Sequence, residues 1–173
     1  MSKQYYFAYG SNLPHTLMHR RCPDSERCDA GTIENYSLSF GAGGYANIRE
    51  CKGAVVCGAV FEISPSDVRR LDYYEGYPHL YDKRTVEVQL ENGETVEALV
   101  YLMPEKYAKQ KTLPSEGYIV TVLQGYRDWG LPHDVLVDAL KTVKKAYNGG
   151  GVSRDALVEL VEDARREAVN DRV

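Results

Sequence analysis

The sequence has few cysteines, no long apolar run and no concentration of positive charge. Its four cysteines, in a chain of 173 residues, form no C-x-x-C pair and are most simply free thiols of a reducing compartment. No apolar stretch approaches membrane-spanning length, and the N-terminus MSKQYYFAYG lacks the apolar segment and cleavage site of a signal peptide. We therefore expect a cytoplasmic protein without a membrane partner.

Charge and composition further limit the kinds of protein that this sequence can encode. The formal net charge is −4, with Lys and Arg interspersed among the acids, which is a poor match for a nucleic-acid partner because phosphate binding needs a concentrated basic face. Hydrophobic residues make up 43% and charged residues 27% of the chain, as in ordinary globular proteins. We expect one domain over residues 1–173, with a C-terminal helix at about 152–173 as its most peripheral part.

One spacing is compatible with a metal site. His15 and His19 lie four residues apart on an expected helix, and Cys22 follows three residues later, with Cys28 as a candidate fourth ligand. An amphipathic helix with two surface histidines explains the same residues. Because pair spacing is common and a closed tetrahedral site is not, we predict no metal here.

The hydrophobic patterns predict a mixture of strands and helices. Asn12 is a candidate N-cap of a helix, and Ser64, Pro65, Asp67 and Gly76 carry the start and stop signals of another. Residues 41–53 are read as a glycine-rich loop, and Asn92-Gly93 predicts a hairpin. Expected strands are 4–9, 31–40, 54–63, 82–90 and 95–103, and expected helices are 12–21, 64–75, 115–130, 131–147 and 153–169. This order favours an α+β fold around a mostly antiparallel, strongly curved sheet.

The stretch YGSN, directly after the first strand, is a candidate anion site. Gly10 permits a tight turn, so the amides of Gly10, Ser11 and Asn12 can converge on one point beside the start of the expected helix. The turn is short and has no lysine, which suits a carboxylate better than a phosphate. A plain turn with a helix cap explains the stretch equally well.

Glu75 is a candidate for acid–base chemistry. With Val68 and Leu71 it falls on one helical face, where an apolar residue is expected, and a sheltered carboxylate has a perturbed pKa. Four nearby tyrosines could orient it: Tyr73, Tyr74, Tyr77 and Tyr81. Periodicity alone slightly favours a frayed, solvated helix end. Ser11 with His15 is rejected as a nucleophile and base, because no G-x-S-x-G elbow and no orienting acid are present.

Several motifs together resemble the gamma-glutamylcyclotransferase family. YFAYGSNL, GGYANI, GAVFEISPSDVRRLDYYEGYPHLY, VEALVYLM and PSEGYIVTVLQGYRDWGLP appear in the family's order, from Tyr6 to about Tyr147. The resemblance implies a small, strongly curved β-barrel flanked by helices. It also implies an enzyme without a cofactor, whose small-molecule partner is a γ-glutamyl amine or γ-glutamyl-amino acid converted to 5-oxoproline and the free amine.

The resemblance also implies roles for particular residues. Glu75 matches the family's catalytic glutamate, acting as general base and then general acid. Tyr118, and with less secure spacing Tyr81, match tyrosines that line the pocket. The expected substrate-binding stretch consists of Tyr6, Phe7, Ala8, Tyr9, Gly10, Ser11 and Asn12.

Other functions are compatible with the same residues, both inside the gamma-glutamylcyclotransferase family and outside it. The chain could be a γ-glutamylamine cyclotransferase, an enzyme that removes a γ-glutamyl group from a biosynthetic intermediate, or a non-catalytic module that binds a small acidic metabolite. The sequence does not name the leaving amine. The amphipathic C-terminal helices are compatible with a homodimer.

Overall fold

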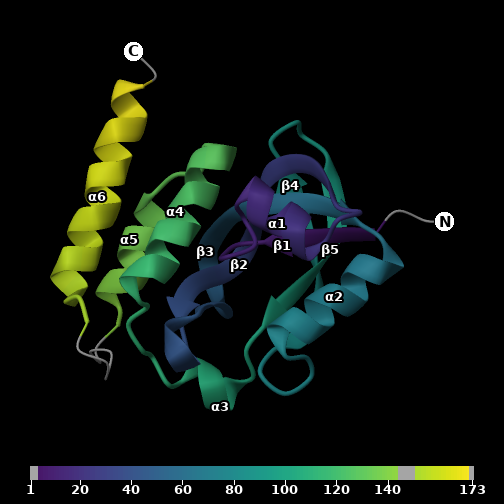
Figure 1. The fold of residues 1–173 in the computed structure, drawn as a ribbon, viewed down its shortest axis with the longest axis horizontal. Helices are drawn as coiled ribbons and strands as arrows, with labels where there is room; N and C mark the ends of the chain where they lie inside the picture. Colours follow the sequence, from purple (N-terminus) through teal and green to yellow (C-terminus); the bar gives the residue numbers. More distant parts are fainter. Residues whose placement is uncertain (1–3, 144–150, 172–173) are drawn as a thin grey trace.

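The computed structural model describes residues 4–143 and 151–171, and in it five strands close into a barrel (Figure 1). Their order around the barrel is β1-β3-β2-β4-β5. β1 pairs with β5 in parallel, which closes the barrel, and every other pairing is antiparallel. The strands are β1 (Gln4–Ala8), β2 (Glu26–Phe40), β3 (Ala46–Ile63), β4 (Asp82–Leu90) and β5 (Thr95–Leu102). The expected α+β fold with a curved, mostly antiparallel sheet is confirmed.

Two glycines allow so small a barrel to close. Gly31 of β2 and Gly58 of β3 are directly paired. A Cβ on Gly58 would lie 2.3 Å from the Ala8 carbonyl oxygen, and one on Gly31 would lie 2.8 Å from the Gln89 carbonyl oxygen. Real side chains do not tolerate such distances, so these two positions let β1 and β4 cross the central pair closely.

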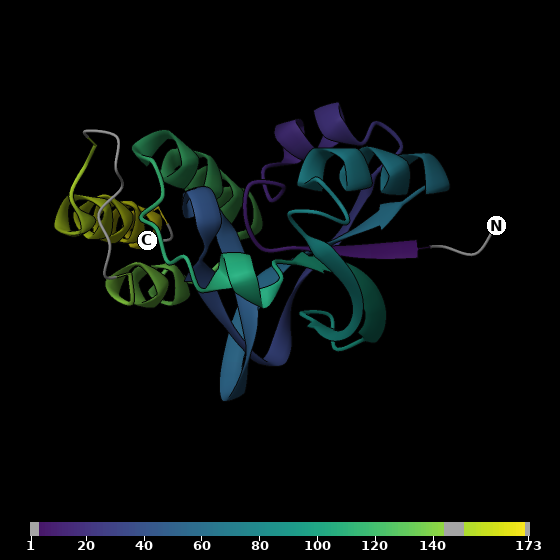
Figure 2. The same cartoon turned by 90° about the horizontal axis from the view of Figure 1, so that it is seen from below.

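The helices form two groups on either side of the barrel (Figures 1 and 2). α1 and α2 lie side by side next to one end of the barrel, while α4, α5 and α6 pack together against the other side. The short α3 and the 3₁₀ turn η1 lie in connecting segments. The bounds are α1 (His15–Arg21), η1 (Ala42–Gly44), α2 (Pro65–Glu75), α3 (Glu105–Ala108), α4 (Glu116–Trp129), α5 (Asp134–Lys141) and α6 (Arg154–Asn170).

The strongest local signals of the sequence are confirmed. Ser64 caps α2: its side chain accepts from the Asp67 amide, and the Asp67 carboxylate accepts from the Ser64 amide. Gly76 ends the helix in the left-handed region, with φ 66° and ψ 32°. The turn at Asn92 and Gly93 joins β4 and β5 as expected.

Five expectations about boundaries were wrong or incomplete. β2 begins at Glu26 and not at residue 31. α1 begins at His15 rather than at residue 12, and its N-cap position is Pro14, so Asn12 is not a helix cap. β3 begins at Ala46, so residues 46–53 are strand and not loop. α3 was not expected, and α5 ends at Lys141, while residues 144–147 of the expected helix lie outside the described residues. Pairing with β2 explains β3, because the neighbouring strand supplies the hydrogen bonds that a loop would lack.

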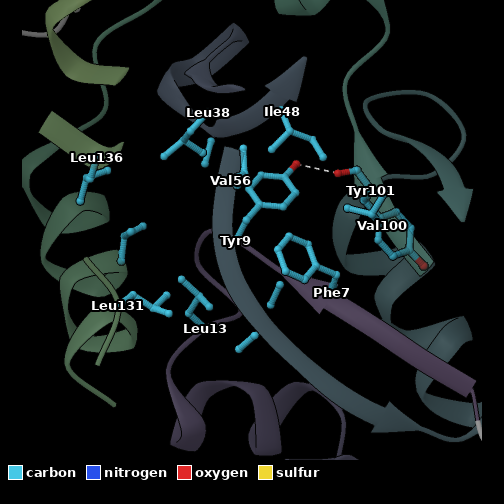
Figure 3. Close-up of a cluster of buried hydrophobic side chains, with 14 of the residues drawn as sticks. Phe7, Tyr9, Leu13, Leu38, Ile48, Val56, Val100, Tyr101, Leu131 and Leu136 are labelled. Atoms are coloured by element: carbon cyan, nitrogen blue, oxygen red, sulfur yellow. Dashed lines mark hydrogen bonds between the residues drawn. The ribbon is translucent and has the colours of Figure 1, made fainter. Parts of the chain in front are cut away.

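The hydrophobic core fills the barrel and continues to the helices beside it. Phe7 and Val56 lie inside, and Leu131 and Leu136 meet them from the helical side (Figure 3). The Tyr9 hydroxyl, at the edge of this core, donates to the Tyr101 carbonyl oxygen at 2.6 Å. The core therefore reaches the end of β1, where the YGSN turn begins. Within residues 4–143 and 151–171, no helix has both the length and the apolar character needed to cross a bilayer.

Candidate active site

A cavity of about 370 Å³ opens where the end of β1, α1, the end of α2 and the start of α4 meet. The turn after β1 forms one wall, and the last residue of α2 faces it from the other side. Most lining side chains carry hydroxyl, amide or charged groups. The lining residues are Tyr6, Tyr9, Gly10, Ser11, Asn12, Leu17, Arg21, Tyr45, Ala46, Tyr74, Glu75, Leu80, Tyr81, Tyr101, Tyr118 and Thr121.

Asn12 connects the polar groups of this cavity. Its side chain is buried, and its Nδ2 donates to the Tyr6 hydroxyl and to Glu75 Oε1, both at 2.9 Å. Its Oδ1 accepts from Arg21. Since both amide hydrogens and the carbonyl oxygen are engaged, the orientation of the amide is determined. The residue expected to cap a helix instead links an arginine to a glutamate.

Glu75 is the last residue of α2 and is partly buried in the cavity. Burial raises the pKa of its carboxyl group from 4.5 to about 7, against the opposing effects of the Arg21 charge and the Asn12 hydrogen bond. The helical face that includes Leu71 does turn inward, and Leu71 is fully buried. The solvated helix end that periodicity slightly favoured is therefore not observed. A carboxyl group with a pKa of about 7 can accept and return a proton near neutral pH.

Arg21 supplies the positive charge of the cavity. Its Nη1 donates to the Ser11 carbonyl and hydroxyl oxygens, each at 3.3 Å, as well as to Asn12. Its guanidinium lies over the Tyr74 ring, 3.6 Å from the centroid. Hydrogen bonds on one side and an aromatic face on the other hold the group in place.

Three tyrosine hydroxyls bind the backbone around the cavity. Tyr9 donates to the Tyr101 carbonyl, and Tyr81 donates to the Ala46 carbonyl at 2.8 Å. The Tyr118 hydroxyl accepts from the Ala46 amide at 3.0 Å. Burial raises the pKa of all three phenols above the usual value of 10, so they are neutral at physiological pH. They form a polar, uncharged wall opposite Glu75 and Arg21.

Gly10 is favoured by the limited space around it rather than by backbone conformation. The φ angle of Gly10 is not positive, whereas several other described glycines do have a positive φ. A Cβ at this position would come within 3.1 Å of both the Ala46 Cβ and the Tyr118 hydroxyl. Glycine therefore lets the turn approach the Tyr118 wall closely, and the expected conformational reason does not apply.

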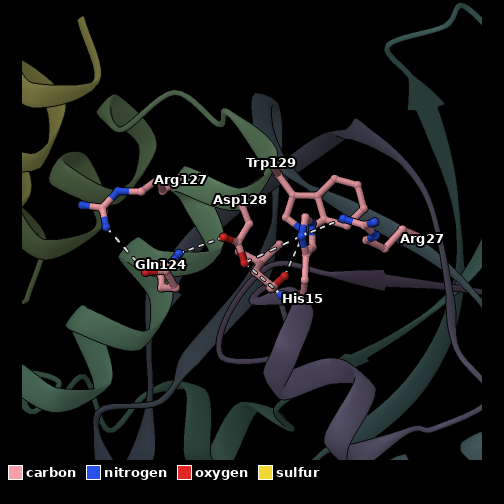
Figure 4. A network of polar contacts seen from close by, with 7 residues as sticks. His15, Arg27, Gln124, Arg127, Asp128 and Trp129 are labelled. Carbon is pink, nitrogen blue, oxygen red and sulfur yellow. Dashed lines mark hydrogen bonds and ion pairs between the residues drawn. The ribbon is translucent and has the colours of Figure 1, made fainter. Parts of the chain in front are cut away.

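The start of α1 does not face the cavity. The His15 amide donates to Asp128 Oδ2 at 2.9 Å, and the His15 ring packs edge-on against Trp129 (Figure 4). An acid therefore does lie near this histidine, 4.0 Å from its Nδ1, which the sequence did not indicate. The expected contribution of the helix N-terminus to an anion site is not observed, because Asp128 already occupies it.

Most residues expected at the site come together. Tyr6, Tyr9, Gly10, Ser11, Asn12, Glu75, Tyr81 and Tyr118 all line the cavity. Phe7 and Ala8 do not; both are fully buried in the core, where they pack against Gly58. Alternation along a strand explains Phe7, since its neighbours Tyr6 and Ala8 point to the opposite face.

The four tyrosines near Glu75 divide between the cavity and the outside. Tyr74 and Tyr81 line the cavity. Tyr73 is 92% exposed, and Tyr77 lies outside the cavity with the Lys83 ammonium 4.1 Å from its ring centroid. Tyr73 and Tyr77 therefore do not orient Glu75.

Sequence reasoning missed Arg21, Tyr45 and Tyr101. Arg21 stands at the end of a short helix, where a lysine or arginine is ordinary, and only its spacing from Leu17 on one helical face hinted at a shared role. Tyr45 stacks edge-on with Tyr118, at 5.6 Å between centroids. The Tyr101 hydroxyl donates to Asp72 at 2.6 Å.

The spacing of His15, His19 and Cys22 does not produce a metal cluster. Cys22 is buried, and its thiol contacts the Asp67 carbonyl at 3.8 Å. Among the described residues, no group of three or more His, Cys, Asp or Glu side chains could hold a metal ion.

Comparisons with known proteins agree with this geometry. A family model described as "Gamma-glutamyl cyclotransferase, AIG2-like" matches residues 6–120. The gamma-glutamylcyclotransferase of Mus musculus is 27% identical over 91% of this chain and 87% of its own length, and that of Homo sapiens is 29% identical over 87% and 84%. A solved structure of a gamma-glutamyl cyclotransferase is 25% identical and superposes with a TM-score of 0.71, covering 94% of this chain and 99% of its own. The chain belongs to the gamma-glutamyl cyclotransferase, AIG2-like family of enzymes.

Proposed function

We propose that this protein cyclises the γ-glutamyl group of a small substrate, releasing 5-oxoproline and the free amine, with Glu75 as the proton acceptor and donor. The observation that carries the proposal is a single carboxyl group, with a pKa of about 7, inside a cavity lined by neutral hydroxyls. A cavity that only bound a carboxylate would gain nothing from a second, sheltered carboxylate facing it.

The reaction needs a proton carrier at this position. The α-ammonium group of the substrate, with a pKa of about 8, has no lone pair until it loses a proton. Its nitrogen then attacks the γ-carbonyl carbon, a C–N bond forms, and the bond to the leaving nitrogen breaks. In the balance, two protons leave the α-nitrogen and two arrive at the leaving nitrogen. Glu75 relays them in turn as base and acid.

The turn after β1 is suited to the α-carboxylate of the substrate. Gly10, Ser11 and Asn12 line the cavity, and the Arg21 guanidinium adds positive charge beside them. Holding the carboxylate there would fold the γ-glutamyl group back toward Glu75. Ring closure within one molecule then avoids most of the entropy cost of bringing the reacting atoms together. Backbone N–H groups of the turn would stabilise the oxyanion that forms.

Release of 5-oxoproline tests the proposal. We expect wild type to release it from at least one of γ-glutamyl-alanine, glutathione and a γ-glutamyl-lysine derivative. Glu75→Gln should lower kcat by roughly 10²- to 10⁴-fold, because the glutamine can still accept the Asn12 hydrogen bond but cannot carry a proton. Calorimetry should find substrate binding retained.

A control variant shows whether the loss of activity depends on the position of the carboxyl group that is removed. Glu97 is exposed on β5 and does not line the cavity, so Glu97→Gln makes the same chemical change outside the site and should keep wild-type kcat. Full activity in Glu75→Gln would remove Glu75 from its role. Saturable binding without 5-oxoproline from any substrate would contradict the proposed reaction.

A further inference from the structure

A groove lies next to the cavity that holds Glu75. It crosses the outer face of α2, and its lining residues are Arg21, Ser66, Arg69, Arg70, Tyr73 and Tyr74. Arg21 and Tyr74 also line the cavity that holds Glu75. The two hollows therefore share a border, formed by the stacked guanidinium and phenol ring. α1 and α2, which flank this border, lie side by side (Figure 2).

The length of the groove exceeds that of one amino acid. Ser66 and Tyr74 are both in α2, eight residues apart, and a helix rises about 1.5 Å per residue, so the groove follows about 12 Å of helix. An extended peptide spans about 3.3–3.6 Å per residue. The groove can therefore accommodate about three extended residues beyond the cavity.

The groove is positively charged. Arg69 and Arg70 are exposed, and in the part of the chain that the structure describes neither forms an ion pair with a carboxylate. The nearby acids of α2 are engaged elsewhere: Asp67 is buried in the capping box, and Asp72 binds Lys83 and Tyr101. Asp24 lies beside the start of the same helix, where it accepts a hydrogen bond from the Ser64 hydroxyl at 2.8 Å. An exposed arginine pair that forms no ion pair with these acids is suited to a carboxylate, which a guanidinium binds through two parallel hydrogen bonds.

Two tyrosines complete the surface. Tyr73 is 92% exposed and Tyr74 46% exposed, although both are large and partly apolar. Both side chains line the groove, and the Arg21 guanidinium covers one face of the Tyr74 ring. Exposed aromatic side chains offer apolar surface on which a peptide can pack. A cationic amine, in contrast, would meet three guanidinium groups here and would be repelled.

We propose that this groove binds the leaving portion of the substrate, and that this portion is a peptide of at least two residues whose free C-terminal carboxylate is held by Arg69 and Arg70. The assignment rests on the proposed cyclotransferase reaction and specifies its substrate. A single leaving amino acid carries its carboxylate on the carbon next to the leaving nitrogen, whereas Arg69 and Arg70 precede Glu75 by five to six residues, about 8–9 Å of helix. The arginine pair therefore determines specificity and takes no part in the chemistry.

Three probes test the assignment: γ-glutamyl-alanine, γ-glutamyl-alanyl-glycine, and the C-terminal amide of the latter. For wild type, kcat/KM should be roughly fivefold higher for γ-glutamyl-alanyl-glycine than for its amide, the range expected for exposed ion pairs. γ-Glutamyl-alanine should resemble the amide. In Arg69→Gln/Arg70→Gln the advantage of the free carboxylate should disappear through a higher KM, while kcat and the rate with the amide stay unchanged.

Arg20→Gln is the matched control, because Arg20 is an exposed arginine next to Arg21 that lines neither hollow. It should keep the wild-type preference. Equal turnover of the free acid and the amide by wild type, or a preference for γ-glutamyl-alanine, would overturn the assignment while leaving the cyclotransferase reaction intact. Absence of 5-oxoproline from all three probes would overturn the reaction and the assignment with it.

Discussion

At the scale of single residues, three influences act on the pKa of Glu75: burial, which is the largest, then the charge of Arg21, then the hydrogen bond from Asn12. The Asn12 Nδ2 donates to Glu75 at 2.9 Å and thereby favours the ionised carboxylate, while burial favours the neutral acid. Arg21 also favours the ionised form through its charge. The pKa of about 7 is the result of these opposing effects, which leaves Glu75 able to act in both directions near neutral pH.

The first prediction concerns the pH dependence of activity. Because Glu75 must be ionised to accept a proton, kcat/KM of wild type should rise about tenfold per pH unit below pH 7. It should fall again above the pKa of the substrate ammonium, about 8, where the proton that Glu75 relays is lost. Asn12→Ala removes a hydrogen bond that lowers the pKa, so the acidic limb should move to higher pH. Rates of 5-oxoproline release measured between pH 5 and 9 would show the displacement.

Tyr6→Phe is the control for this shift. The Tyr6 hydroxyl accepts the other Asn12 hydrogen, so its loss leaves the Glu75 hydrogen bond in place. The acidic limb of Tyr6→Phe should stay closer to that of wild type. An unmoved limb in Asn12→Ala would mean that this hydrogen bond does not set the pKa.

At the scale of elements, α4 supports the turn that forms the site. Gly125 lies under this turn, and a Cβ there would approach the Leu13 Cβ to 2.2 Å and the Pro14 nitrogen to 3.0 Å. The Trp129 indole N–H also donates to the Leu13 carbonyl at 2.8 Å (Figure 4 shows Trp129 beside His15). The position of residues 10–14 therefore depends on close contact with a helix distant in sequence.

The second prediction follows from that contact. Gly125→Ala should lower the free energy of unfolding by about 1–3 kcal/mol, since the extra methyl group overfills the interface. It should also reduce kcat/KM by about tenfold or more, because the turn moves relative to Glu75. Urea denaturation and 5-oxoproline release measure the two effects.

Gly117→Ala provides the comparison within the same helix. A Cβ at Gly117 has nothing within 4 Å. This variant should be neutral or stabilised by up to about 1 kcal/mol, because alanine favours helix more than glycine does. Equal losses in both variants would show that the contact between Gly125 and the turn is not responsible.

At the scale of the whole molecule, burying the Glu75 carboxyl group lowers the free energy of unfolding at neutral pH. A carboxyl group whose pKa rises on folding binds more protons in the native state than in the unfolded state between the two pKa values. For Glu75 this interval runs from 4.5 to about 7. Stability contributed by this group is therefore greatest below the interval and is lost as pH rises through it.

The third prediction concerns how the free energy of unfolding changes with pH. Between pH 4.5 and 7.5 the free energy of unfolding of wild type should fall by up to about 3 kcal/mol relative to Glu75→Gln, whose side chain does not titrate. Chemical denaturation of both proteins across this range provides the difference. A difference that is constant with pH would contradict the raised pKa.

The fourth prediction concerns α6, expected from the sequence to be peripheral. It buries Leu157 and Val161 against its neighbours α4 and α5 but contributes no residue to the cavity. Removing residues 151–173 should lower stability by roughly 3–5 kcal/mol, from the loss of these two side chains. The kcat of the protein that remains folded should be unchanged. A lower kcat measured well below the melting temperature would show that α6 supports the site.

The extent of the domain, the formation of a homodimer and the cytoplasmic location of the protein stay predictions.

The sequence alone predicted the features that depend on neighbouring residues. The caps of α2, the hairpin at Asn92-Gly93 and the inward face of α2 that includes Leu71 follow from turn chemistry and helical periodicity. Periodicity did not decide the position of Glu75, for which it slightly favoured a solvated helix end. The motif order in addition predicted the family and half of the residues that line the cavity, most of which lie in β1 and the stretch after it.

Only the tertiary structure decided what depends on residues far apart in the chain. Asn12 faces Glu75 instead of capping α1, because α1 starts later and α2 lies beside it. Gly10 is favoured because it leaves room beside Tyr118, and Arg21 belongs to the site through its contacts with Asn12 and with Tyr74 of α2. The pKa of Glu75 likewise arises from burial and charges that meet only in the folded chain, since desolvation and charge interactions depend on distance in space.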